Sequence, residues 1–260
     1  MRLIITGATG SAGSEVLRQA LQDARITAVT TLTRTPLPSY FVPTDKQSDK
    51  LTQIVHPDFS NYPSELLERL SGHDACIWAL GTSSIGMNEP DYTRVTHEFA
   101  TNAARAFSQI NVNRDDCRKF VFAYLSGARS TQSPTPSTQG WFNTPMWARV
   151  KGRTESDLAK VPNLATYSFR PAFIVSDNLP PPEYRTRYNT PLLKFVGTAI
   201  GAISDTGAVR AETLAKAMIR ACLEGSNGKV EGWEGKGVQG DAGVFENSEI
   251  KRLGSGLAAH

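Results

Sequence analysis

Three glycines lie three residues apart near the start of the chain, directly after a short apolar run. They are Gly7, Gly10 and Gly13, and glycine at this spacing lets the backbone turn tightly and approach a ligand closely. A helix that starts at such a turn offers unpaired N–H groups and the positive end of its dipole to a pyrophosphate. The pattern therefore predicts a dinucleotide site. The residues expected to contact the cofactor here are Gly7, Thr9, Gly10, Ser11, Ala12 and Gly13.

A glycine triplet also occurs in ordinary turns, so its surroundings decide between the two interpretations. The run before it, Leu3–Ile5, is typical of a buried parallel strand. After it, apolar residues return at helical spacing. These residues are Val16, Leu17, Ala20 and Leu21. A strand, a turn and a helix in this order favour the nucleotide site over a plain turn.

The residues after the expected second strand bear on the choice of cofactor. An NAD site usually has an Asp or Glu there, which accepts hydrogen bonds from the ribose 2′-hydroxyl. This chain has Arg34 between two threonines, and a guanidinium matches the oxygens of a 2′-phosphate. Arg34 therefore predicts NADP (NADPH) as the cofactor, and a solvated surface arginine is the alternative.

Composition and charge restrict the other functions. The chain has 260 residues and a net charge of +3, which indicates neither a nucleic-acid partner nor a membrane surface. Its 3 cysteines and 4 histidines are dispersed, so we expect no metal site and no disulfide framework. No targeting segment is evident, because glycines interrupt the first apolar run, and a cytoplasmic location is expected. A protein partner or a homo-oligomer stays open.

Apolar, strand-like runs alternate with helical patterns along the chain. Further strands are expected at Ile26–Leu32, Leu51–Val55, Ala75–Leu80, Phe120–Leu125 and Thr166–Ile174. Between the third and fourth strands, Ser64–Leu70 is expected to begin a helix with Ser64 as its N-cap. The alternation predicts an α/β fold with a doubly wound parallel sheet, helices on both faces and the ligand at the carboxyl ends of the strands.

The length predicts a single domain over residues 1–260. We expect its core at about 1–175, and a loop-rich substrate side with a C-terminal helix and tail at about 176–260. Three long loops are expected, at Thr35–Lys50, Ser130–Pro145 and Ser176–Pro191. The last two follow strands at the ligand side, so they are predicted to act as lids or substrate loops. In the glycine-rich tail, the expected anchors are Trp233, Val244, Phe245 and Ile250.

The order of these motifs resembles that of the short-chain dehydrogenase/reductase superfamily. The resemblance rests on the glycine triplet, on Asp58 after the third strand and on the small-residue turn 79–82 after the fourth. Further matching segments are Leu125–Ala128, Val150–Glu155, Phe169–Ile174 and Ala215–Met218. The resemblance covers most of the chain but skips the long loops. Within the superfamily, the chain is similar to the atypical NAD(P)-binding group, which also contains an oxidoreductase-like regulator.

The resemblance implies further cofactor contacts. Asp58 would meet the edge of the adenine ring, and a turn-forming role after Pro57 is the alternative. The turn after the fourth strand would line the ribose and diphosphate of the cofactor. Its residues are Leu80, Gly81 and Thr82.

The resemblance also implies which residues face the reaction. Lys151 would hold the nicotinamide ribose hydroxyls unless it is a solvated helix lysine, and Ser126 would face the substrate unless it is a plain turn residue. The usual catalytic tyrosine of the superfamily stands four residues before the lysine, one helical turn away, but this chain has Trp147 there. An indole N–H donates a hydrogen bond but cannot act as an acid or base near neutral pH. The expected catalytic residues are thus Lys151, Ser126 and Trp147. Tyr124, Tyr167 or a hydroxyl group on the loops are further candidates for the proton donor, and spacing supports none of them.

Two functions are compatible with this sequence. One is an NADP-dependent oxidoreductase, or a redox isomerase, that acts on a small organic substrate. The other is a non-catalytic NADPH-binding regulatory protein, which the tryptophan at the tyrosine position favours.

Overall fold

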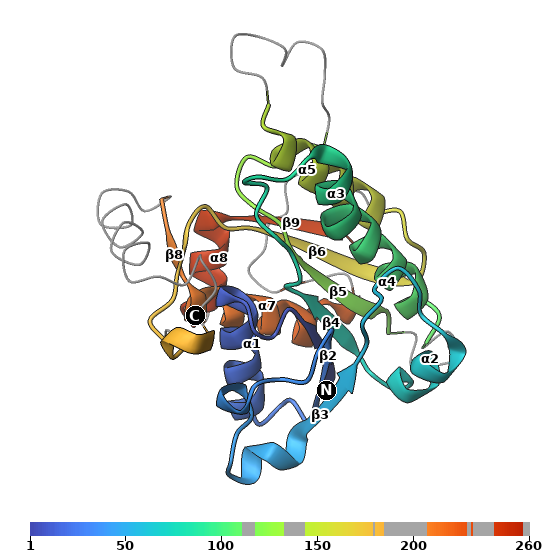
Figure 1. Ribbon diagram of the computed structural model, residues 1–260, viewed down its shortest axis with the longest axis vertical. Helices are drawn as coiled ribbons and strands as arrows, with labels where there is room; N and C mark the ends of the chain where they lie inside the picture. Colours follow the sequence, from blue (N-terminus) through green and yellow to red (C-terminus); the bar gives the residue numbers. More distant parts are fainter. Residues whose placement is uncertain are drawn as a thin grey trace.

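Seven parallel strands form one sheet in the computed structural model of the chain, in the order β3-β2-β1-β4-β5-β6-β9 (Figure 1). Their bounds are β1 Arg2–Thr6, β2 Ala28–Thr33, β3 Leu51–Val55, β4 Ala75–Trp78, β5 Phe120–Leu125, β6 Leu164–Arg170 and β9 Ala242–Glu246. The structure describes residues 1–110, 118–132, 144–178, 180–184, 207–227, 230 and 242–256. The strand order reverses between β1 and β4, and ligands bind at such a switch point in open α/β sheets.

Helices cover both faces of this sheet (Figure 1). The longer helices are α1 Ser11–Gln22, α2 Ser64–Leu70, α4 Phe99–Phe107, α5 Met146–Leu158, α7 Ala211–Glu224 and α8 Asn247–Gly254. The short helical segments are α3 Glu89–Thr93, the π-helical η3 Arg94–Glu98, and the 3-10 turns η1 Ser39–Phe41, η2 Lys46–Lys50, η5 Pro182–Tyr184 and η6 Gly225–Asn227. A separate two-stranded sheet pairs β7 Ile174–Val175 with β8 Val209–Arg210.

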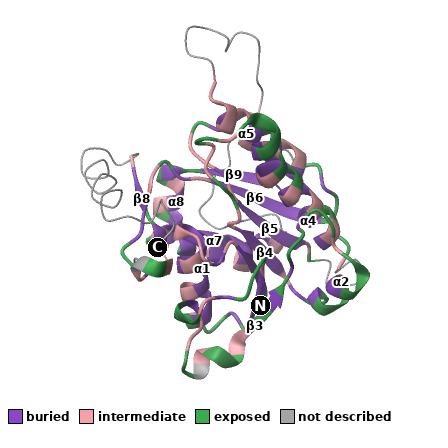
Figure 2. Ribbon diagram, viewed as in Figure 1, coloured by how far each residue is buried: buried purple, intermediate pink, exposed green. Residues whose placement is uncertain are grey.

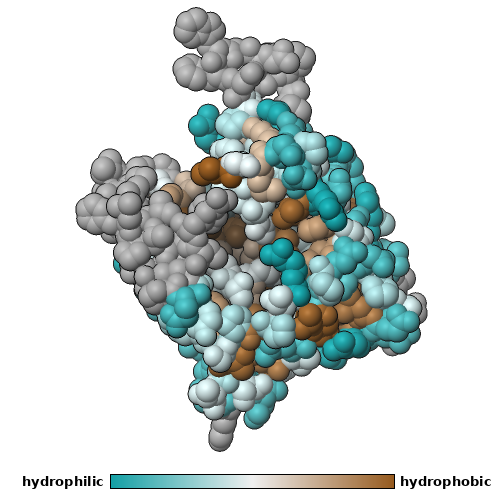
Figure 3. Space-filling view, in the orientation of Figure 1, coloured by the Kyte–Doolittle hydropathy of each residue, from teal (hydrophilic) through white to brown (hydrophobic). Residues whose placement is uncertain are grey.

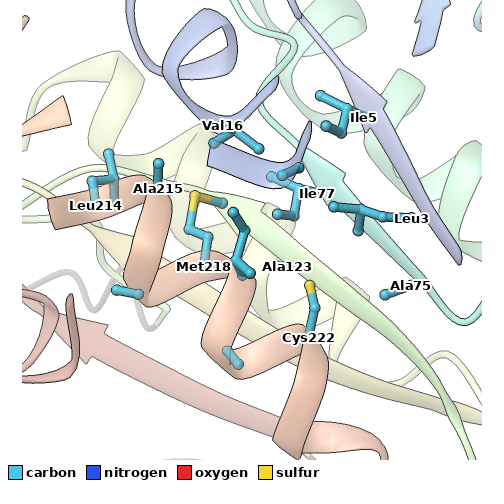
Figure 4. Close-up of a cluster of buried hydrophobic side chains, with 14 of the residues drawn as sticks. Leu3, Ile5, Val16, Ala75, Ile77, Ala123, Leu214, Ala215, Met218 and Cys222 are labelled. Atoms are coloured by element: carbon cyan, nitrogen blue, oxygen red, sulfur yellow. The ribbon is translucent and has the colours of Figure 1, made fainter. Parts of the chain in front are cut away.

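The side chains of β1 show how the two helical layers are held. Leu3 and Ile5 belong to a buried cluster with apolar residues of α1, α7 and α8 (Figure 4). Ile4 belongs to a second cluster with Trp78 and residues of α2, α4 and α5, because successive strand side chains point to opposite faces. All strands of this sheet except the edge strand β3 are largely buried (Figure 2), as is typical of a parallel sheet covered on both sides.

The prediction of an α/β, doubly wound parallel sheet is confirmed. β3 and β5 have the predicted bounds, while the ends of β2 and β4 differ by one or two residues. The prediction of one strand over Thr166–Ile174 is wrong in its second half, because β6 ends at Arg170 and Ile174 belongs to the small sheet. Pro171 follows Arg170 directly, and a proline has no N–H group to give to a strand ladder.

Helix α2 also has the predicted bounds, but its expected cap is wrong. Pro63 is the N-cap residue, and no side chain caps the helix. Ser64 already lies in the first turn of the helix, so its hydroxyl does not occupy the capping position.

The last part of the chain adds a strand to the sheet, whereas the sequence predicts only a tail that packs onto the domain there. β9 pairs with β6, and the ring of Phe245 stacks on that of Phe169 with centroids 4.8 Å apart. Val244, Phe245 and Ile250 are buried, which confirms them as anchors. Trp233 lies outside the described residues, as do large parts of the loops 130–145 and 176–191.

Candidate functional site

The glycine turn between β1 and α1 is tight enough to exclude side chains at two positions. Gly7 has a φ of +68°, and a Cβ atom there would lie 2.5 Å from the carbonyl carbon of Ala79. A Cβ atom at Gly13 would lie 2.0 Å from the carbonyl oxygen of Gly7. Heavy atoms do not approach so closely, so only glycine allows β1, α1 and the turn after β4 to come together.

The start of α1 is suited to an anion. Gly10 is the N-cap residue, no side chain makes a cap hydrogen bond, and the first turn holds no acidic residue. The N–H group of Gly10 donates to the carbonyl oxygen of Gly7 at 2.9 Å, which closes the turn. Thr9 and Ser11 are half-buried beside it, and Ala12 is buried. A helix N-terminus with this backbone fits the diphosphate of a dinucleotide.

Four further predicted cofactor residues lie at the same edge of the sheet. Arg34 is exposed directly after β2, which pairs with β1. The N–H group of Leu80 donates to the Thr6 hydroxyl at 3.3 Å, which ties the turn after β4 to β1. Gly81 and Thr82 follow and are exposed.

Asp58 is exposed and stabilises a turn. Its Oδ1 atom accepts a hydrogen bond from the N–H group of Ser60 at 2.9 Å, and this bond lowers the pKa of the Asp58 carboxyl. This hydrogen bond supports the alternative role of Asp58 as a turn former. Its contact with an adenine ring stays a prediction.

A cavity of about 900 Å³ opens at the carboxyl ends of the strands. On the face turned to the viewer, Figure 3 shows a hollow with apolar and weakly polar walls. The residues that line the cavity come from the start of α1, from α3, from the first half of α5, from β7 and from the segments after β4, β5 and β6. They are Ser11, Ser83, Ser84, Ile85, Tyr92, Ser126, Gly127, Ala128, Arg129, Trp147, Lys151, Pro171, Ala172, Phe173 and Ile174. The cavity thus brings all three expected catalytic residues together with the helix start.

Lys151 lies on α5 and is half-buried. Its Nζ atom donates a hydrogen bond to the carbonyl oxygen of Ser126 at 2.7 Å. Burial lowers the pKa of Lys151 to about 8, because the surrounding protein disfavours the ammonium, and the nearby Glu155 carboxylate partly opposes this effect. A solvated helix lysine has neither property, so this alternative does not describe Lys151.

Trp147 stands one helical turn before Lys151 on the same helix and lines the same cavity. Its ring lies beside the turn after β5, since a Cβ atom added at Gly127 would lie 3.8 Å from Cζ3 of the indole. The indole therefore forms part of the wall, where it can stack on a flat ligand.

Ser126 follows β5 and is buried. Its hydroxyl donates to Oε1 of Glu155 at 2.5 Å and lies 3.1 Å from the Ser130 hydroxyl. Glu155 also accepts hydrogen bonds from Gln132 at 3.1 Å and from Nε of Arg170 at 2.9 Å, and it forms an ion pair with the same guanidinium. Ser126 thus belongs to a buried network around Glu155.

Sequence reasoning assigned no role to Glu155 or Arg170. Glu155 stands one helical turn after Lys151, and Arg170 ends an otherwise apolar strand. A lysine and a glutamate four residues apart on a helix share a face, which was the available signal. The sequence alone does not show that the partner of this glutamate is an arginine from another strand.

The two tyrosines considered as proton donors lie away from the cavity. Tyr124 is buried in the cluster with Trp78, and burial raises the pKa of its phenol. Tyr167 is buried in the other cluster, and its hydroxyl donates to the carbonyl oxygen of Gly225 at 2.9 Å. Among the described tyrosines, Tyr92 lines the cavity, and no spacing in the sequence selects it.

Within the described ranges, no group of three or more His, Cys, Asp or Glu residues gathers that could hold a metal ion. Cys76 and Cys222 are buried free thiols. None of the described helices is long and apolar enough to cross a membrane.

Comparisons with known proteins agree with this geometry. The model of a family described as NAD(P)H-binding matches residues 7–222. The chain is 29% identical over 231 residues to protein fmp52, mitochondrial, of Aspergillus niger, which covers 87% of this chain and 88% of that protein. It is 32% identical over 126 residues to the Leucinostatins biosynthesis cluster protein T of Purpureocillium lilacinum, which covers 48% of this chain and 42% of that protein.

Solved structures share the fold at low sequence identity. Gre2 from Candida albicans, in complex with NADPH, superposes with a TM-score of 0.63 at 12% identity and covers 86% of this chain and 75% of that one. The UDP-glucuronic acid 4-epimerase from Bacillus cereus, in complex with NAD, has a TM-score of 0.61 at 13% identity and covers 95% of this chain and 77% of that one.

Proposed function

The chain belongs to the NAD(P)H-binding family, and from this premise we propose that it is an NADP-dependent oxidoreductase, or a redox isomerase, of the atypical short-chain dehydrogenase type. Its substrate is a small organic carbonyl compound or alcohol. The observation that carries this proposal is one cavity that joins the start of α1 to Lys151 and Trp147. When bound, the dinucleotide supplies or accepts a hydride.

The chain's own residues hold the cofactor and exclude water. The glycine turn and the start of α1 bind the diphosphate, the turn 80–82 lines the ribose, and Asp58 meets the adenine. Lys151 holds the nicotinamide ribose hydroxyls. The indole of Trp147 covers the reacting groups and keeps water out.

Lys151 also supplies the proton that a tyrosine would otherwise supply. In reduction, the carbonyl carbon gains the hydride, and the oxygen takes one proton from the Lys151 ammonium. The neutral amine that remains regains its proton from water. A pKa of about 8 leaves Lys151 mostly protonated at neutral pH and yet acidic enough to give its proton up.

Arg34 selects NADP over NAD in this proposal. It is exposed after β2, next to the strand that enters the glycine turn. One charge-assisted hydrogen bond to a 2′-phosphate is worth about 1.5–3 kcal/mol, which corresponds to a preference of roughly ten- to a hundredfold.

The proposal is tested by titration of the purified protein with NADPH and NADH, followed by a screen of carbonyl and enone compounds for NADPH oxidation. We expect micromolar NADPH binding, much weaker NADH binding and turnover of at least one compound class. Lys151→Ala should abolish turnover. Unchanged turnover in this variant would contradict the role of Lys151.

The second function is a non-catalytic NADPH-binding regulatory protein, which Trp147 at the tyrosine position favours. It predicts tight NADPH binding, no oxidation of any compound, and a protein partner whose affinity changes with the nucleotide. A pull-down with and without NADPH measures this difference. A partner indifferent to NADPH would exclude it.

We propose a cytoplasmic location, because the buried free thiols of Cys76 and Cys222 fit a reducing compartment. The fmp52 relatives carry the label mitochondrial, so mitochondria are the alternative. Fractionation of cells that express the full-length protein distinguishes the two.

A further inference from the structure

Among the described residues that line the cavity, the charged side chains are of one sign. They are Lys151 and Arg129, and no aspartate or glutamate is among these described residues. Most of the remaining wall is apolar, and Ile85 at its edge is 72% exposed. A large aliphatic side chain left open beside two cations suits a ligand that has both an apolar body and an anionic group.

The two cations have different surroundings. The Nζ atom of Lys151 donates to the carbonyl oxygen of Ser126. Arg129 is exposed, and no carboxylate of the described residues pairs with it. Other arginines near the site do pair, since Arg170 binds Glu155 and Arg149 binds Glu89. Arg129 therefore keeps its guanidinium available at the wall.

The backbone of Arg129 is held in an unfavourable conformation. Its φ is +66°, one of two positive φ values among the described non-glycine residues. The backbone on both sides is fixed, because the N–H group of Ala128 donates to Pro171 at 2.9 Å and that of Ser130 donates to Gly127 at 3.2 Å. Strained residues of this kind gather at ligand sites, and glycine would fit this position without strain.

We propose that Arg129 binds an anionic oxygen group of the substrate, so that the substrates are carbonyl compounds with an apolar body and a carboxylate. This inference rests on the proposed function in one respect, namely that the bound ligand is a substrate. The carboxylate pairs with the guanidinium, and the apolar body lies against Ile85, Phe173 and Trp147. In this arrangement Lys151 faces the reacting carbonyl. Its Nζ lies next to the turn that carries Arg129, since a Cβ atom placed at Gly127 would be 3.6 Å from it.

The test uses binding and does not depend on turnover. Octanoate and octanamide, which share an apolar chain and differ in charge, are titrated calorimetrically into the full-length protein with and without NADP⁺. We expect octanoate to bind about tenfold more tightly than octanamide. Arg129→Gln should remove this preference and leave octanamide binding unchanged. Arg105→Gln, on an exposed position of α4 away from the cavity, should leave both affinities unchanged.

Arg129→Gly separates a ligand role from a structural one. We expect it to lose octanoate binding like Arg129→Gln and to keep or raise the melting temperature, because glycine relieves the positive φ. A wild-type protein that binds octanoate no better than octanamide overturns the inference. So does an equal loss in the Arg105 and Arg129 variants.

Titration of the same variants with NADPH distinguishes the two anions that Arg129 could bind, a substrate carboxylate and a cofactor phosphate. We expect Arg129→Gln to bind NADPH as the wild type does. A matching loss of NADPH affinity would assign Arg129 to a cofactor phosphate and overturn the inference. Failure of the proposed function is distinct, since the protein would then oxidise no NADPH while its charge-dependent octanoate binding persists.

Discussion

The Nζ atom of Lys151 lies 2.7 Å from the carbonyl oxygen of Ser126, the first residue after β5. The hydroxyl of the same serine donates to Glu155. Ser126 therefore joins the lysine to the buried ion pair of Glu155 and Arg170 and fixes the place of the ammonium. The proposed role of Lys151 as proton donor therefore predicts effects of pH and of substitutions at these residues that can be measured.

The rate of carbonyl reduction should fall as the pH rises through about 8, because Lys151 must be protonated to donate and its pKa is about 8. A profile of kcat for NADPH oxidation between pH 6 and pH 10 measures this. Lys151→Arg is the control, since a guanidinium does not give up its proton over this range. This variant should therefore reduce little or no carbonyl compound at any of these pH values. A wild-type profile that is flat across this range would exclude Lys151 as the proton donor.

Lys151→Met should raise the free energy of unfolding at pH 7 by about 1–3 kcal/mol. The pKa of Lys151 falls from its usual 10.5 to about 8 on folding, so folding disfavours the ammonium. This penalty is fully present below pH 8 and disappears as the pH rises from about 8 to 10.5. Urea unfolding of both proteins at pH 7 and pH 10.5 tests the sign. A methionine variant that is less stable at pH 7 would contradict it.

Gly13→Ala should destabilise the protein by about 2–3 kcal/mol and abolish NADPH binding, because the new methyl group would overlap the Gly7 carbonyl. Gly81→Ala is the matched control for stability, since a Cβ atom there meets nothing within 4 Å. Its unfolding free energy should change by less than about 0.5 kcal/mol. Thermal unfolding and NADPH titration measure both effects, and a Gly13→Ala protein that binds NADPH normally would refute the tight turn.

Glu155→Gln should cost about 3 kcal/mol, because it leaves the buried guanidinium of Arg170 without its main counter-charge. Glu246 pairs with the same arginine at 2.8 Å but is 52% exposed, so Glu246→Gln should cost less than about 1 kcal/mol. Urea unfolding compares the two variants. Glu155→Gln should also move the pH break of Lys151 below 8, since the carboxylate raises the pKa of this lysine. Equal losses of stability in the Glu155 and Glu246 variants would contradict Glu155 as the main counter-charge of Arg170.

Arg34→Ala should weaken NADPH binding by roughly ten- to a hundredfold and leave NADH binding nearly unchanged. Fluorescence titration with both nucleotides measures this. A parallel loss for both nucleotides would indicate that Arg34 supports the fold and does not read the 2′-phosphate.

The sheet could be predicted because its signals are local. The apolar runs of β3 and β5 and the strand–turn–helix at Gly7–Gly13 depend on neighbouring residues only. The end of β6 could not be predicted from apolar residues alone, because the apolar run continues through Pro171 to Ile174. Pro171 has no N–H group for the strand ladder, and the strand ends before it. β9 was missed because a five-residue strand after a glycine-rich stretch becomes visible only through its partner β6.

Lys151, Trp147 and Ser126 line one cavity, and their roles there stay predictions. The contacts between residues of the candidate site could not be predicted from the sequence. The link from Glu155 to Arg170 joins residues 15 apart in sequence on different elements, and no local spacing encodes it. Arg129 was overlooked because its positive φ is a property of the folded turn.

The position of β9 has a consequence for how this protein emerges from the ribosome. The described residues of the cavity wall lie between Ser11 and Ile174, so this part of the site is synthesised early. The edge of β6 that β9 covers stays open until residues 242–246 have left the exit tunnel. Nascent or truncated chains that end before β9 therefore expose an unpaired strand and recruit chaperones or one another.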